Sequence, residues 1–253
     1  MRVAIVTGAG GDIGRAIAAA LRADGFLVLA ADIDRSAAER VAAEVDGIHP
    51  WQCDVTDPSA VKAMASAARA VGPVHVLVNN AGRATGLSLG SMDLAAWRKD
   101  MTLNLEAAYI CFDAVAADLK ASAGCLINIA SVNGLGVYGH PAYSAAKAGL
   151  LQFTRMVAVE YGKFGVRANA VAPGSVRTRA WEERAAANPD VWEEVKRWYP
   201  LKRIALTRDI AAAVSFLAGP SANAISGVCL PVDCGLTAGQ TELAHTFSQS
   251  DDY

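Results

Sequence analysis

The amino-acid sequence predicts an α/β fold, a doubly wound parallel sheet of about seven strands with helices on both faces. Two observations lead to this prediction. Short apolar runs alternate with longer, Ala-rich runs of helical period, and no internal repeat or Pro/Gly-rich linker interrupts them. A glycine-rich loop follows the first apolar run directly. Because successive parallel strands need a crossover, usually a helix, this alternation predicts parallel strands with right-handed connections.

Seven short apolar runs are the expected strands, at residues 3–7, 26–31, 48–52, 74–78, 125–130, 167–171 and 228–232. Six longer runs with apolar residues at helical spacing are the expected helices, at residues 13–23, 35–44, 59–70, 94–119, 142–161 and 207–218. Residues 1–239 are expected to form a single domain. A long insertion at 179–199 breaks the alternation, and a polar tail at 240–253 either lacks order or docks on a neighbouring subunit.

Composition excludes several classes of protein. The chain has 253 residues, of which 53% are hydrophobic and 19% charged, so it is long and apolar enough for a large core. A net charge of −2 gives no basic surface for nucleic acid. No apolar run reaches the roughly 18 residues of a membrane span, and no signal peptide precedes the first strand, so a cytoplasmic location is expected. Five cysteines and four histidines lack the spacing of a disulfide framework or metal site, so no metal is expected.

The first expected strand ends in a glycine-rich loop with Gly8, Gly10, Gly11 and Gly14, and a helix follows at once. Glycines at this place allow a tight turn and let a pyrophosphate approach the free N–H groups of the helix. Asp32 ends the second strand and would accept hydrogen bonds from an adenosine ribose. Its charge would repel a 2′-phosphate, so the sequence favours NAD over NADP.

A second motif places a phenol and an ammonium one helical turn apart, at Tyr143 and Lys147. A free tyrosine has a pKa of about 10, so acid–base work near neutral pH requires a nearby positive charge. Lowering the pKa by roughly three units needs about 4 kcal/mol, which a lysine and a second cation can supply.

Seven motifs stand in one order along the chain: Thr7–Gly14, Asp54-Val55, Asn79-Asn80-Ala81-Gly82, Asn104, Ser131, Tyr143-x-x-x-Lys147 and Pro173-Gly174-x-x-x-Thr178. On these motifs the chain resembles the short-chain dehydrogenase/reductase family from Met1 to about Gly239. The resemblance implies a Rossmann-type fold that binds a nicotinamide dinucleotide. The cofactor residues expected on this basis are Gly8, Asp12, Ile13, Gly14, Asp32, Ile33, Asp54, Val55, Asn80, Ala81, Gly82, Tyr143, Lys147, Pro173, Gly174, Val176 and Thr178.

The same resemblance and the residue types predict a hydride transfer between the nicotinamide and a secondary alcohol or ketone. Tyr143 is the expected acid/base, and Ser131 would hydrogen-bond the reacting oxygen. Lys147, together with the oxidised nicotinamide, would lower the pKa of Tyr143 and hold the nicotinamide ribose. Asn104 would carry a water that relays the proton.

Two positions depart from the family pattern. Asp12 stands where the family usually has glycine, so its carboxylate is expected to point away from the pyrophosphate or to cap the following helix. Cys234 replaces a glycine after Val232-Asp233, a change expected to affect packing more than chemistry.

The substrate is less defined. The family uses the stretch at about 179–200 as a lid over the substrate, and here it contains Trp181, Trp192 and Trp198. Candidate substrate residues are Asn133, Tyr138, His140 and Trp181, with Arg83, Arg179 and Arg184 as further polar contacts. His140 fits equally well as a residue that starts the helix after it, before Pro141. A polar secondary alcohol, such as a sugar or polyol, is the favoured substrate.

Three functional hypotheses follow. The leading one is an NAD-dependent alcohol or sugar dehydrogenase. An NADPH-dependent ketone or 3-oxoacyl reductase shares most of the motifs, and Arg35, close after Asp32, keeps it open. A catalytically silent nucleotide-sensing protein is the third. The resemblance further implies a homotetramer or dimer built from the helices at 94–119 and 142–161.

Overall fold

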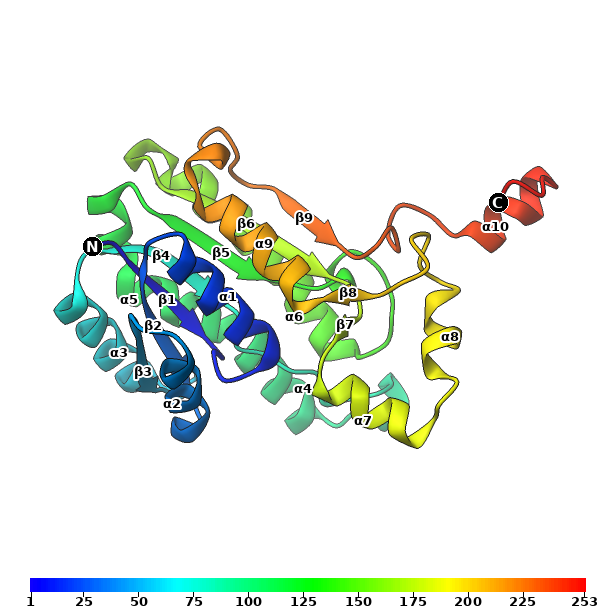
Figure 1. The fold of residues 1–253 in the computed structure, drawn as a ribbon, viewed down its shortest axis with the longest axis horizontal. Coiled ribbons are helices and arrows are strands. Elements are labelled where there is room, and N and C mark those ends of the chain that lie inside the picture. Colours follow the sequence, from blue (N-terminus) through cyan, green and yellow to red (C-terminus); the bar gives the residue numbers. More distant parts are fainter.

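The computed structural model describes residues 1–253, except for the side chains of Ala180 and Arg184. Seven parallel strands form the central sheet in the order β3-β2-β1-β4-β5-β6-β9 (Figure 1). Their bounds are β1 Val3–Thr7, β2 Leu27–Asp32, β3 Ile48–Gln52, β4 Val74–Asn79, β5 Cys125–Ile129, β6 Arg167–Pro173 and β9 Cys229–Val232. A small second sheet pairs β7 (Val176–Arg177) with β8 (Ala205–Leu206). The predicted α/β fold with a seven-stranded parallel sheet is therefore confirmed.

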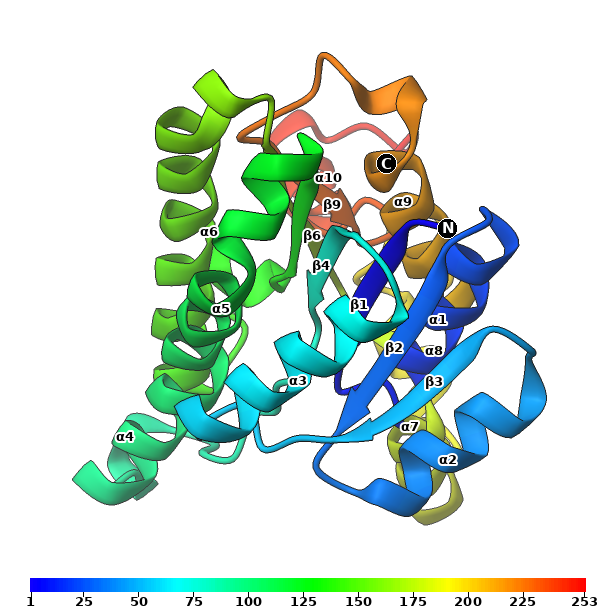
Figure 2. The ribbon, with the colours of Figure 1, turned by 90° about the vertical axis from the view of Figure 1, so that its left-hand side faces the viewer.

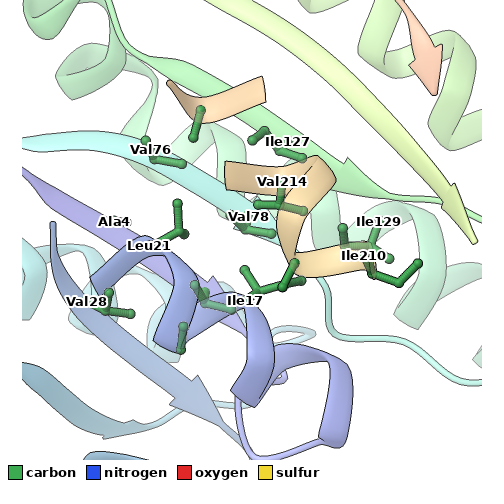
Figure 3. Close-up of a cluster of buried hydrophobic side chains, with 14 of the residues drawn as sticks. Ala4, Ile17, Leu21, Val28, Val76, Val78, Ile127, Ile129, Ile210 and Val214 are labelled. Atoms are coloured by element: carbon green, nitrogen blue, oxygen red, sulfur yellow. The ribbon is translucent and has the colours of Figure 1, made fainter. Parts of the chain in front are cut away.

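Helices cover both faces of this sheet (Figure 2). On one face lie α1 (Asp12–Ala23), α2 (Arg35–Glu44) and α9 (Thr207–Ala218), and Figure 3 shows apolar side chains of α1 and α9 packed against the strands. On the other face lie α3 (Pro58–Val71), α5 (Ala107–Ser122) and α6 (Pro141–Tyr161). Strands buried on both faces explain the continuous apolar runs in the sequence.

The helix expected at 94–119 is in fact three segments. An α-helix, α4 (Leu94–Met101), leads into a π-helical turn at Thr102–Glu106, and α5 begins at Ala107. The amide of Asn104 lies in this turn and donates to the carbonyls of Arg83 and Asp100. A π-turn widens the helix by one residue and is frequent at functional sites. Here it turns a buried amide towards the loop after β4.

The insertion at 179–199 forms two helices, α7 (Arg179–Ala187) and α8 (Val191–Lys196), beside the carboxyl ends of the strands (Figure 1). The tail contains a helix, α10 (Thr241–Ser248), which extends away from the body of the molecule (Figure 1). This helix exposes the apolar side chains of Leu243 and Phe247. Among the described residues, no helix is long and apolar enough to cross a membrane.

Candidate active site

The carboxyl ends of the parallel strands open into one cleft of about 1860 Å³. Open parallel sheets bind their ligands at this edge. Because small-molecule pockets usually measure roughly 300–1,000 Å³, the cleft has room for a cofactor and a substrate together. Every residue predicted to bind the cofactor lines it, as do Ser131 and the four substrate candidates, whereas Asn104 does not.

The lining residues fall into two groups by origin. The strand-end wall comprises the lining residues at 8–14, 32–34, 54–56 and 80–84, which follow β1, β2, β3 and β4. The lid wall comprises the lining residues at 133–140, 175–199 and 236–240, from loops and helices outside the central sheet. Ser131, Tyr143 and Lys147 belong to neither wall.

The glycine-rich loop is shaped for a ligand that needs close contact with the backbone. Gly8 has φ +61°, and a Cβ added there would lie 2.8 Å from the Cα of Ala81. A Cβ on Gly14 would lie 2.2 Å from the carbonyl oxygen of Gly8. Asn80 fixes the loop, because its amide donates to the carbonyls of Thr7 (2.9 Å) and Gly8 (3.0 Å). Only glycine fits at positions 8 and 14, and the free N–H groups at the start of α1 suit a pyrophosphate.

Asp32 lies at the end of β2, beside this loop. One carboxylate oxygen accepts from the backbone N–H of Gly10 (2.8 Å) and the other from that of Asp34 (3.0 Å). The carboxylate is thus held in the cleft, with acceptor sites left for ribose hydroxyls. Arg35 does not line the cleft and pairs with Glu39 at 2.8 Å. The residues present therefore fit a dinucleotide.

The carboxylate of Asp12 does not cap α1 and is held by Arg179 at the start of α7. It accepts from the backbone N–H of Arg179 (2.8 Å) and pairs with the guanidinium of the same residue (3.1 Å). The helix is preceded by Gly11, which offers no side-chain cap. Asp12 thus joins the start of α7, on the lid wall, to the start of α1, on the strand-end wall.

Lys147 lines the cleft and is almost completely buried. Its side chain donates to the carbonyl of Ile129 at 2.7 Å, and its Nζ lies 5.5 Å from the centre of the Tyr143 ring. The residue is 3% exposed, and burial lowers the pKa of its ammonium to about 8. Burial penalises the charged form, so Lys147 loses its proton more readily than its sequence motif suggests.

The pKa of Tyr143 depends on surroundings that the sequence motif does not show. In the protein alone, burial raises the pKa of its phenol above the usual 10 and the charge of Asp100 raises it further, while a hydrogen bond with Ser131 lowers it. In the protein alone, the presence of Lys147 therefore does not bring the pKa of Tyr143 below its usual value. The expectation rested on two positive charges, and the second, an oxidised nicotinamide, stays a prediction.

Asn104 lines a separate small cavity of about 10 Å³, close to the size of one water, together with Lys147 and Asn79. Its side-chain oxygen accepts from the N–H of Arg83 at 3.1 Å. Asn79 donates to Asn128 at 2.9 Å, but its buried Oδ1 lacks a partner among the described residues. A water in this cavity would satisfy that oxygen. The predicted water-carrying role of Asn104 is compatible with this position and stays a prediction.

The four substrate candidates all lie on the lid wall, yet their polar atoms are used differently. The amide of Asn133 donates to the carbonyl of Gly139 (2.9 Å) and to the hydroxyl of Ser144 (3.1 Å), while its oxygen accepts from Ser131 (3.2 Å). Asn133 therefore holds the loop before α6. His140 places its Nδ1 2.7 Å from the carbonyl of Gly86.

The tryptophans of the expected lid, at about 179–200, divide between packing and lining. Trp181 lines the cleft and packs on Trp192, with ring centres 5.8 Å apart. Trp192 in turn lies under the guanidinium of Arg177. Trp198 lines the cleft and is 44% exposed. Arg83 and Arg179 also line the cleft, whereas the side chain of Arg184 lies outside the described residues.

Several lining residues were not predicted from the sequence: Arg40, Arg98, Lys99, Glu183, Val195, Tyr199, Leu236 and Gln240. Arg40 lies one turn beyond Ser36, to whose hydroxyl it donates, and a helix starting near residue 35 could have revealed it. Leu236 and Gln240 carry no sequence signal, because they reach the cleft only through the path of the chain after β9.

Comparison with known proteins agrees with this geometry. A family model described as enoyl-(acyl carrier protein) reductase matches residues 8–237. The crystal structure of an oxidoreductase of the short-chain dehydrogenase/reductase family from Burkholderia thailandensis has a TM-score of 0.93 and 43% identity, covering 100% of this chain and 99% of that one.

Two enzymes with named substrates are also similar along almost their whole length. The meso-2,3-butanediol dehydrogenase of Serratia marcescens is 33% identical over 94% of this chain and 95% of its own. The galactitol 2-dehydrogenase (L-tagatose-forming) of Cereibacter sphaeroides is 36% identical over 92% of this chain and 94% of its own. The chain therefore belongs to the short-chain dehydrogenase/reductase family of oxidoreductases, which use NAD(H) or NADP(H).

Proposed function

We propose that this short-chain dehydrogenase/reductase oxidises a polar secondary alcohol of the sugar or polyol type with NAD⁺. One observation carries the proposal: Ser131, Tyr143 and Lys147 converge on a cleft whose strand-end wall holds the Asp32 carboxylate. The first three residues suit proton transfer at an alcohol oxygen. A carboxylate held by two backbone N–H groups suits ribose hydroxyls and repels a 2′-phosphate.

Each residue has a distinct task in this reaction. Tyr143 accepts the proton of the substrate hydroxyl, and the hydroxyl of Ser131 binds the same oxygen and orients it. Lys147 holds its charge near the Tyr143 ring and donates to the carbonyl of Ile129. With a cofactor bound, it would also donate to the nicotinamide ribose. When bound, the oxidised nicotinamide accepts the hydride. Asn104 and the small cavity beside Lys147 hold the water that takes the proton onward.

The lid wall supports a neutral, hydroxylated substrate. It combines the aromatic side chains of Tyr138, Trp181 and Trp198 with the polar side chains of His140 and Gln240. Its two charged side chains, Arg179 and Glu183, have opposite signs. Aromatic rings with a few placed polar groups are what an uncharged polar ligand needs. The two relatives named above act on a diol and on a polyol, which agrees with the proposal.

The test is NADH formation by the purified protein with NAD⁺ across polyols, sugars and secondary alcohols, repeated with NADP⁺. Turnover with NAD⁺ is expected, and Tyr143→Phe should reduce it by about 10²–10⁴-fold, the usual contribution of a general acid or base. The affinity of the variant for NAD⁺ should stay near that of the wild type. A variant that keeps most of its rate would falsify this mechanism.

An NADPH-dependent ketone or 3-oxoacyl reductase is the second candidate. Arg40 lines the cleft near Asp34, where a guanidinium could bind a 2′-phosphate, and the matching family model is described as enoyl-(acyl carrier protein) reductase. Affinity for NADP⁺ above that for NAD⁺ would favour it. A silent sensing protein would instead bind a cofactor tightly and turn over no substrate of either panel.

We also propose that the protein is a homo-oligomer, either a tetramer or a dimer. Tyr109 on α5 and Met156 and Val159 on α6 are large apolar side chains that are more than half exposed. Burying them against a second copy would be favourable. Light scattering coupled to size exclusion tests this proposal, and a monomer at micromolar concentration would contradict it.

A further inference from the structure

The loop before α6 holds one residue in an uncommon backbone conformation. His140 has φ +55°, directly after Gly139 with φ +87°, and the helix begins at Pro141. The carbonyl of Gly139 accepts from Asn133 (2.9 Å) and from the hydroxyl of Ser144 (2.7 Å). Left-handed backbone at a residue other than glycine persists when its surroundings hold it, and it clusters at functional sites. The loop therefore fixes where the imidazole lies.

The hydrogen bond to the neighbouring loop decides which ring nitrogen is free. Nδ1 of His140 lies 2.7 Å from the carbonyl oxygen of Gly86. A carbonyl oxygen only accepts, so Nδ1 carries the proton, and a neutral imidazole is then an acceptor at Nε2. No described residue donates to Nε2, and the side chain lines the cleft. The lid wall therefore presents one hydrogen-bond acceptor that the protein itself does not satisfy.

The imidazole ring of His140 lies beside the ring of Tyr143. His140 precedes Tyr143 by three residues, and their rings meet edge to face with centres 6.4 Å apart. Tyr143 and Ser131 are the groups proposed to bind the oxygen that reacts. An oxygen on the next carbon of the substrate would then lie on the side of His140. Since Nε2 only accepts, that oxygen must carry a hydrogen.

We infer that His140 selects substrates in which a second hydroxyl stands on the carbon beside the reacting one, that is, vicinal diols. The inference rests on the proposed oxidation and adds a requirement to it. A bound substrate that covers Nε2 without donating to it removes the hydrogen bond of this nitrogen to water, which lowers the affinity for that substrate. His140 acts here as a specificity-determining residue, because the hydroxyl it binds is not the one that reacts.

The alternative is that His140 only joins the two loops through Gly86. The variant His140→Asn separates the two roles. Asparagine tolerates left-handed backbone and places an N–H donor at the position of Nδ1, so the bond to Gly86 is kept. It has no atom at the position of Nε2. His75→Asn is the matched control, because His75 also approaches a backbone carbonyl (Pro73, 2.9 Å) but lies at the opposite end of β4 from the cleft.

The experiment compares meso-2,3-butanediol with its monomethyl ether, which keeps the second oxygen and loses its hydrogen. The wild type and His75→Asn should oxidise the diol with a kcat/KM about tenfold higher than the ether, the effect of one hydrogen bond. His140→Asn should bring this ratio close to one. An unchanged ratio in His140→Asn, or no preference in the wild type, would overturn the inference.

Calorimetric titration of the same two compounds into the protein with NADH measures binding without turnover. The diol should bind about tenfold more tightly than the ether to the wild type and equally to His140→Asn. If this difference is found without any oxidation, the role of His140 stands and the proposed activity fails. If both compounds are oxidised and bind equally to the wild type, the role of His140 fails and the activity stands.

Discussion

The strand-end wall and the lid wall of the cleft are held in place by different means. Residues of the strand-end wall lie at or just after the ends of β1 to β4, and the side chains of β1, β2 and β4 are mostly buried in the two large apolar cores. The lid wall is held by individual hydrogen bonds. The backbone N–H of Arg179 donates to Asp12, the N–H of Ser175 donates to the hydroxyl of Tyr199 (2.9 Å), and the imidazole of His140 bonds the carbonyl of Gly86. The strand-end wall, which is expected to bind the nucleotide, is thus part of the sheet. The lid wall, where the substrate candidates lie, consists of loops and helices outside the sheet, so substitutions there should have little effect on the stability of the core.

The largest effect on turnover is expected at Lys147, which lines the cleft but belongs to neither wall. Lys147→Met should lower turnover by about 10²–10⁴-fold, because the charge beside Tyr143 is lost. The same change should stabilise the fold at pH 7 by up to about 3 kcal/mol, since a buried ammonium is replaced by an apolar side chain of similar length. Thermal unfolding and initial rates measured on the same sample test both effects.

The stabilisation should depend on pH with a defined sign. Burial lowers the pKa of Lys147 to about 8 from its usual 10.5, so the cost of burying the charge is fully present below pH 8. Between pH 8 and 10.5 the unfolded chain binds this proton and the folded chain does not, so the stability of the wild type rises towards that of the variant. Lys62→Met changes an exposed lysine and should show no such convergence. A variant less stable than the wild type at pH 7 would contradict the prediction.

At the strand-end wall, Asp32→Asn tests the basis of cofactor choice. Removing the charge should weaken NAD⁺ binding by about 10- to 100-fold, the worth of a charged hydrogen bond, while NADP⁺ loses less. Asp34→Asn is the control, because Asp34 caps α2 and asparagine caps helices equally well. Cofactor titrations followed by protein fluorescence would measure both affinities. Equal losses for the two cofactors would mean that Asp32 supports the loop without reading the ribose.

The strand-end wall could be predicted closely because its signals are local. A glycine-rich loop after an apolar run, and an acid at the end of the next, fix positions along the chain, and the parallel sheet brings those positions to one edge. Asp32 is the last residue of β2, and Gly8 follows β1, as expected. Each residue lies where it does because of its own strand.

The remaining features depend on contacts between distant segments. The π-turn at Asn104 was read as plain helix, because its stabilising partners include Arg83, in another loop. Leu236 and Gln240 enter the lid wall only through the path of the tail. The raised pKa of Tyr143 comes from burial, which no spacing of residues reveals. Sequence patterns therefore predict which side chains form the site better than they predict the burial and hydrogen-bond partners of those side chains.

Gly14 offers a smaller test of how rigid the strand-end wall is. Gly14→Ala should lower the free energy of unfolding by about 1–3 kcal/mol, because the new Cβ would meet the backbone of Gly8 and Ala9 at 2.2 and 2.8 Å. Gly11→Ala is the matched control in the same loop, where the nearest atom is 3.5 Å away. Chemical denaturation of the two variants tests the difference. Equal stability of the two variants would mean that the loop shifts to make room for the added methyl group.

The smallest effect is expected where the two walls join, at the pair of Asp12 and Arg179. Arg179 is 74% exposed in its side chain, so the pair adds little to stability. Its role should instead be to neutralise a carboxylate beside the loop that binds the pyrophosphate. Arg179→Ala should weaken cofactor binding by about fivefold, since the free charge of Asp12 then repels the phosphates. Adding Asp12→Asn to Arg179→Ala should restore the affinity, and high salt should reduce the effect of the single change.

Arg177→Ala is the control, because it removes a neighbouring exposed guanidinium that pairs with Glu182, and it should leave cofactor affinity unchanged. A double variant as weak as Arg179→Ala would show that Arg179 itself binds the cofactor, and the lid wall would then take part in nucleotide binding.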